Sequence, residues 1–106
     1  MEFPVPLTQK NAILAGIAFD SEGNLWTHSY IDPHNPLPEA PDHIIKIDKA
    51  INTTAPGDLP QIPVTCYRVP SRNTVMHCIT QGPDGNIWFT ELGIDKVGKL
   101  KYNRGR

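Results

Sequence analysis

The chain contains an internal repeat, and this repeat restricts the folds it can adopt more than any other feature. The segment Gly16–Tyr30 aligns without gaps on Cys78–Leu92, at an offset of 62 residues. Both copies share a core of Gly-Asn, an aliphatic residue and Trp, at 23–26 and 85–88, and an acidic residue precedes each core. Self-similarity at a fixed period indicates repeated structural units, each of which packs on its neighbours.

Each copy of the repeat has the pattern of short strands joined by a tight turn. The Gly-Asn pairs are hairpin signals, because Gly and Asn tolerate the positive φ that tight turns require. Runs rich in β-formers flank both turns, and a further matching strand follows each hairpin, at 44–48 and 97–101. Eleven prolines and eight glycines disfavour long helices and suit many short strands. We expect Trp26 and Trp88 to pack between neighbouring sheets.

An outer strand can be assigned to each unit. The segment 64–70 lies between the two copies of the repeat, and a similar segment at 2–7 opens the chain. The sequence therefore predicts an all-β chain of two four-stranded β-propeller blades that form one module over 1–106. We expect an outer strand at 2–7, one blade unit at 14–69 and a second at 76–101. The expected strands cover 2–7, 14–20, 24–30, 43–48, 64–69, 76–81, 86–91 and 96–101.

Two blades cannot close a propeller, because propellers have about four to eight blades. The expected strand order is also out of phase, since an outer strand precedes the first unit and none follows the second. An open pair of blades would expose apolar faces and strand edges to water. We therefore expect a homo-oligomer closed by exchange of the N-terminal strand, and we favour a trimer over a dimer or a tetramer. The alternative is a fragment of a longer propeller.

Two proline-rich segments, 31–42 and 51–62, fit the repeat poorly and are expected to be loops. These loops either carry function at the blade rim or only connect strands. The carboxylates of the 31–42 loop are expected to be solvated, and the alternative is that they hold a cation. The ten basic and eleven acidic side chains are scattered, which argues against nucleic acid as a partner. The sequence has neither a secretory signal pattern nor a bilayer-spanning apolar stretch, so we expect a cytoplasmic protein without membrane contact.

The two cysteines, Cys66 and Cys78, are too few for a disulfide framework and do not have zinc-finger spacing. They would bridge if adjacent strands brought them together. In a cytosolic protein, however, we expect buried free thiols.

The second unit carries a motif that resembles a known family. The segment 77–100 contains Gly-Pro-Asp-Gly-Asn-Ile-Trp-Phe-Thr-Glu and then Lys-Val-Gly-Lys-Leu, and it resembles a blade of the virginiamycin B lyase (streptogramin lyase) propellers. The opening Phe-Pro-Val-Pro-Leu-Thr resembles the outer strand of the same repeat. The motif is specific for the repeat and weak for the activity, because binding and structural propellers share it.

The resemblance implies an enzyme that opens a cyclic depsipeptide by metal-assisted elimination. In that family a histidine acts in proton transfer, and acidic residues line the channel mouth with a Mg²⁺ ion. The positions that carry over are His77, the candidate base, and Glu91, a candidate catalytic residue and Mg²⁺ ligand. The first unit departs from the pattern, with Ala15 and Ser29 at the equivalent positions.

In a hairpin centred on the Asp-Gly turn, His77 and Glu91 are expected to lie opposite each other. Such a pair is a base with its orienting carboxylate, part of a metal site, or a structural tie that recurs in each blade. His28 and Tyr30 share a strand face with Trp26 and are candidate ligand-binding residues at the channel. The alternative is that they are packed or solvated strand residues.

Three functions remain open at this level. The first is a propeller module that assembles into a ring and binds a small ligand at its central channel. The second is a streptogramin-lyase-like C–O lyase, with Mg²⁺ as cofactor, that acts on a cyclic depsipeptide or another natural product. The third is a propeller fragment without activity of its own.

Overall fold

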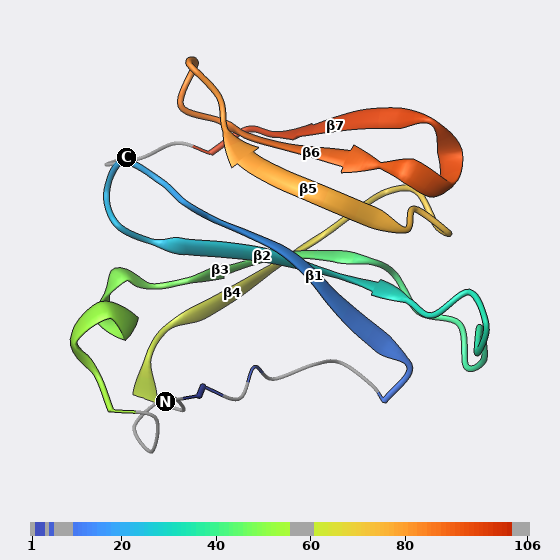
Figure 1. Cartoon of the computed structure of the whole chain (residues 1–106), viewed down its shortest axis with the longest axis horizontal. Coiled ribbons are helices and arrows are strands. Elements are labelled where there is room, and N and C mark those ends of the chain that lie inside the picture. Colours follow the sequence, from blue (N-terminus) through green and yellow to red (C-terminus); the bar gives the residue numbers. More distant parts are fainter. Residues whose placement is uncertain (1, 4, 6–9, 56–60, 103–106) are drawn as a thin grey trace.

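The chain forms two antiparallel sheets packed face to face (Figure 1). The computed structural model describes residues 2–3, 5, 10–55 and 61–102. The first sheet has four strands and the second has three. In Figure 1 the second sheet (orange to red) lies above the first (blue to yellow-green). This is the arrangement of two neighbouring propeller blades, and it confirms the prediction of an all-β chain built from blades.

In both sheets every strand pairs with the next along the chain. The first sheet contains β1 (Ala12–Phe19), β2 (Leu25–Ile31), β3 (His43–Ile47) and β4 (Val64–Arg68). The second contains β5 (Met76–Gln81), β6 (Ile87–Glu91) and β7 (Lys96–Leu100). Two short 3₁₀ helices, η1 (Lys49–Thr53) and η3 (Leu92–Ile94), lie in the connections. No helix in the described part of the chain has the length and apolar character needed to cross a membrane.

Seven of the expected strands are present, and their ends differ from the predicted ones by at most two residues. The expected strand at 2–7 falls mostly outside the described residues, and Glu2, Phe3 and Val5, which are described, are not in a strand. Residues 32–42 form a loop, as predicted. The predicted loop at 51–62 begins inside η1, and 56–60 lie outside the described residues.

The register of the strands reproduces the sequence repeat. Trp26 lies opposite Lys46 across β2 and β3, and Trp88 lies opposite Lys99 across β6 and β7. Residues that are equivalent in the repeat therefore occupy equivalent places in the two sheets.

The main hydrophobic core lies between the two sheets. Trp26 is fully buried there, stacked on Tyr67 with ring centroids 5.8 Å apart and edge-on to Tyr102 at 5.1 Å. The buried members of this core are Trp26, Ile44, Val69, Met76, Ile79, Ile87 and Phe89. The prediction that Trp26 packs between sheets is confirmed, whereas Trp88 is only half-buried, on the face of the second sheet that points away from the first.

A smaller apolar cluster lies on the far face of the first sheet. Strand alternation sends Ile44 toward the second sheet and Ile45 and Ile47 to this far face. Phe3 and Val5, from the N-terminal segment, pack against it. The far face of the first sheet is thus apolar as well.

Gly98 is required by the packing of the second sheet. A Cβ at this position would lie 2.3 Å from Cζ of Phe89, whose ring is buried in the core. Gly98→Ala is therefore expected to lower the free energy of unfolding by about 1–3 kcal/mol in urea titrations, because the ring has no free space to move into. The control Lys96→Ala changes an exposed residue of the same strand and is expected to stay within about 0.5 kcal/mol of the wild type. Equal losses in both variants would contradict this explanation.

Candidate functional site

The sequence-predicted site residues lie on three strands: His28 and Tyr30 on β2, His77 on β5 and Glu91 on β6. β2 pairs with β1 and β6 pairs with β5, and these first strands of the two sheets lie against each other. The register of β1 is shifted between Ala15 and Ile17, and that of β5 between Met76 and Ile79. These β-bulges fall at equivalent positions of the repeat. A bulge inserts an unpaired residue and re-aims the side chains around it, which makes this region the candidate site.

The bulge in β5 corrects the expected pairing of His77 with Glu91. Glu91 lies opposite Met76, one residue earlier than a regular hairpin would give. The Glu91 side chain is buried, whereas His77 is exposed. The His77 ring instead contacts the neighbouring thiol, with Nδ1 3.2 Å from Cys78 Sγ. The structure thus brings His77 together with Cys78.

His28 is fully buried between the sheets, and neither of its ring nitrogens has a hydrogen-bond partner. Its Nε2 lies close to Gly16 of β1, since a Cβ added there would lie 3.1 Å from this atom and 3.1 Å from the His77 carbonyl oxygen of β5. Burial lowers the pKa of His28 below its ordinary value of 6.5, backbone groups of His28 and Cys78 oppose this, and the charge on His77 adds to it. Tyr30, on the same strand face, packs against the core. Within the single chain His28 is therefore a packed group and not an open ligand contact.

The stability of the protein is expected to fall on acidification because of His28. Its folded-state pKa lies below the unfolded one, so the unfolded chain takes up the proton first as the pH falls. The contribution of neutral His28 is complete above pH 6.5 and is lost between 6.5 and the lower folded-state pKa. His28→Thr introduces the residue found at the equivalent position 90, and urea titrations between about pH 7.5 and pH 5 should show a shallower decline. An unchanged decline would contradict this assignment.

The Mg²⁺ ion that the resemblance implied stays a prediction. In the described ranges, no group of three or more His, Cys, Asp or Glu side chains is arranged to hold a metal ion. Glu91, the expected ligand, has Met76 opposite it and not a second metal-binding side chain.

The carboxylates of the 31–42 loop serve the fold. Asp42, expected to be solvated, is buried and accepts hydrogen bonds from the backbone N–H and the hydroxyl of Thr74. It thereby ties the first sheet to the segment that leads into β5. Glu39 pairs with Arg72 at 2.8 Å on the surface.

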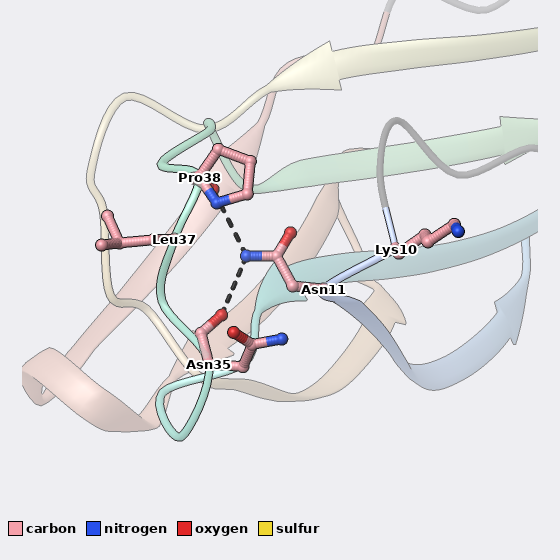
Figure 2. A pocket seen from close by; sticks show the side chains of 5 residues that line it. All are labelled: Lys10, Asn11, Asn35, Leu37 and Pro38. Atoms are coloured by element: carbon pink, nitrogen blue, oxygen red, sulfur yellow. Dashed lines mark hydrogen bonds between the residues drawn. The ribbon is translucent and has the colours of Figure 1, made fainter.

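A hollow of about 420 Å³ lies where this loop meets the start of β1 (Figure 2). Figure 2 shows the Asn11 side chain pointing into the loop, where Nδ2 donates to the carbonyl oxygens of Asn35 at 2.9 Å and Pro38 at 3.3 Å. Lys10 and Leu37 complete the lining. These hydrogen bonds attach the loop to the start of β1, so the residues that line the hollow have a structural role.

A second hollow, also about 420 Å³, lies on the far face of the first sheet between the N-terminal residues and β1. Apolar residues line it apart from Thr27, whose hydroxyl donates within the sheet to the carbonyl oxygens of Ala15 and Gly16. It therefore suits apolar side chains better than a polar substrate. Its apolar walls include Phe3, Val5, Leu14, Ile17, Leu25 and Ile47.

An aspartate accepts a hydrogen bond from the indole of each tryptophan, which was not predicted from the sequence. Asp20 accepts from Trp26 Nε1 at 2.9 Å, and Asp84 accepts from Trp88 Nε1 at 3.1 Å. Burial raises the pKa of Asp20, but hydrogen bonds from Trp26, Asn24 and nearby backbone groups outweigh this and hold it below 3.8. The bond from Trp88 is the main reason that the pKa of Asp84 is lowered. An acidic residue four to six positions before each Trp was the available signal.

Both cysteines are free, as predicted, but exposed and not buried. Cys66 lies opposite Ile45 on β4, the last strand of its sheet, and the bulge of β5 brings Cys78 to the surface. They are on different sheets and form no bridge.

The comparisons with known proteins support the fold. No model of a protein family matches the sequence, and no curated protein matches it. Among solved structures, the chain is similar to a streptogramin B lyase structure, with 21% sequence identity and a TM-score of 0.53. The match covers 99% of this chain and 31% of that one, so the chain spans about a third of the neighbour's length. At this identity the likeness establishes the β-propeller-like fold alone.

Proposed function

We propose that the chain is a two-blade propeller module that assembles with further copies of itself into a closed ring. The observation that carries the proposal is a difference in exposure between residues that are equivalent in the repeat. Ile79 is 8% exposed between the sheets, whereas its equivalent Ile17 is 66% exposed on the far face of the first sheet. Ile44 is 1% exposed, whereas its equivalent Val97 is 66% exposed on the second sheet.

The two outer faces are complementary by construction. The outer face of the second sheet is equivalent, in the repeat, to the inner face of the first sheet. Trp88 on that outer face occupies the position that Trp26 occupies on the inner face. The far face of the first sheet is in turn equivalent to the inner face of the second. Head-to-tail contact between copies would therefore reuse the packing already present within the chain, and a rotation that closes would generate a ring.

Phe3 supports a role of the N-terminal segment in this contact. Phe3 packs against the far face of the first sheet. Tyr67, from β4, packs in a similar way against the main hydrophobic core between the two sheets. Among the described residues, no strand pairs with the outer edge of β7, although β4 covers the equivalent edge of β3. We propose that the N-terminal segment of another copy pairs with this edge as the fourth strand.

In such a ring the first strands, β1 and β5, surround the central channel. We place a small-ligand site there, where exposed His77 side chains of successive copies would recur around the axis. The lyase function implied by the resemblance is less well supported, because Glu91 does not lie opposite His77.

Light scattering coupled to size-exclusion chromatography tests the proposal. We expect a single species of three chain masses, which corresponds to six blades. Two or four chain masses would retain the closed ring with a different number of blades. A species of one chain mass at every concentration would overturn self-assembly.

A further inference from the structure

We propose that Cys78, together with His77, is a thiol-exchange site that forms a mixed disulfide with small disulfides, and that this modification prevents assembly. The first part depends only on the geometry of the bulge in β5. The second part rests on the proposed function.

The bulge holds a thiol and an imidazole in contact at the surface. The Cys78 side chain is exposed, and His77 Nδ1 lies 3.2 Å from its sulfur. The backbone N–H of Cys78 donates to Thr90 Oγ1 at 2.9 Å, which fixes the bulge to β6. A thiol beside a histidine is the usual setting of a reactive cysteine, because the imidazole stabilises the thiolate. Cys66 is also exposed but has no hydrogen-bonded histidine in the described structure, so it provides an internal control.

A second imidazole lies behind the pair. His28 is fully buried, and a Cβ added to Gly16 would lie 3.1 Å both from its Nε2 and from the His77 carbonyl oxygen of β5. Buried polar atoms almost always have a partner. The backbone of Cys78 is the polar group of the bulge that acts on this ring, because it opposes the lowering of the His28 pKa by burial.

The reaction needs only a disulfide, written RSSR, as co-reactant. In the tautomer with an unprotonated Nδ1, His77 accepts the thiol proton, and the Cys78 thiolate attacks one sulfur of RSSR. The S–S bond of RSSR breaks, a Cys78–S–S–R bond forms, and the departing RS⁻ takes the proton and leaves as RSH. Cys78 is oxidised, and one sulfur of the small disulfide is reduced.

The place of Cys78 in the repeat links the modification to assembly. Its equivalent, Gly16, lies close to the second sheet, since an added Cβ would lie 3.1 Å both from the His77 carbonyl oxygen and from Ile79. In the ring, Cys78 would hold the same place opposite the next copy. An R group attached to its sulfur would keep that copy away from the outer face of the second sheet.

The rate of thiol exchange tests the first part. The probe is 5,5′-dithiobis(2-nitrobenzoate), and the protein carries Ile17→Asp, which is expected to keep it as single chains with both thiols accessible. With Cys66→Ser added, Cys78 is expected to react about ten times faster than Cys66 does with Cys78→Ser added. Adding His77→Ala should remove the difference, and urea should equalise the rates. Equal rates in the folded protein, or a Cys78 rate unaffected by His77→Ala, would overturn the reactive site.

The mass of the modified protein tests the second part. Cys66→Ser in the chain with an intact Ile17 is treated with glutathione disulfide, and light scattering is compared before and after. We expect the assembly to dissociate into single chains and to re-form when dithiothreitol removes the adduct. An unchanged mass with Cys78 fully modified would overturn the control of assembly. Single chains before treatment would overturn the ring itself, and the thiol-exchange rates would still decide the first part.

Discussion

Replacing Val97 with aspartate is expected to convert rings into single chains without unfolding them. The Val97 side chain is 66% exposed in the single chain, so a carboxylate there remains hydrated and costs little. In the ring the same position would be buried as Ile44 is between the sheets, and an unpaired charge would be desolvated. The loss is about 3 kcal/mol or more per interface, which is at least about a hundredfold in the concentration needed for assembly. Light scattering and circular dichroism measure the two effects separately.

Ile17→Asp places a charge on the opposite partner face and should have the same effect. The head-to-tail contact gives a sharper outcome when the two variants are mixed. The Val97→Asp chain keeps an intact first-sheet face, and the Ile17→Asp chain keeps an intact second-sheet face, so the mixture should form a two-chain complex that cannot close. An interface that pairs identical faces would show no such rescue. Leu37→Asp, which changes an equally exposed loop residue away from both faces, is the control and should still form rings.

Asp20→Ala is expected to be strongly destabilising within the chain. The carboxylate is buried and accepts hydrogen bonds from Trp26 Nε1, Asn24 Nδ2 and the backbone N–H groups of Glu22 and Asn24. Removing it leaves the buried indole and amide donors without an acceptor, which costs about 2–4 kcal/mol. Urea unfolding of single chains, followed by tryptophan fluorescence in an Ile17→Asp background, measures the loss.

The second unit offers a matched control for Asp20. Asp84 accepts from Trp88 and Asn86 in the same way but is exposed, so Asp84→Ala should cost clearly less. Acid unfolding adds an independent test. Because the folded-state pKa of Asp20 lies below 3.8, its contribution is complete above pH 3.8 and is lost as the pH falls through the lower folded-state value. The Asp20→Ala variant should lack that part of the acid transition, and equal losses for the two aspartates would contradict the role of burial.

The sequence was sufficient for the strands because their signals are local. The Gly-Asn turns and the β-forming runs beside them depend on residues close together in the chain, and seven strands lie where these signals put them. The alignment of the two copies, including the matching strands at 44–48 and 97–101, also predicted which positions are equivalent, as the partners of Trp26 and Trp88 confirm. The expected position of His77 opposite Glu91 was wrong for a local reason as well. Counting outward from a turn assumes a regular ladder, and the bulge in β5 shifts the register by one residue.

By itself the sequence determined the repeat, seven strands and their order, because strand periodicity and turn chemistry act over a few residues. The bulges in β1 and β5, which change the faces that side chains occupy, were visible only in the structure. Only the tertiary structure decided which face is covered, since burial depends on what lies on the other side of the sheet. His28 is buried because β5 packs over it, and Asp42 is buried because the chain returns to it at Thr74. Trp26 and Trp88 have the same local sequence, and they differ in exposure because one has a neighbouring sheet over it in this chain and the other does not.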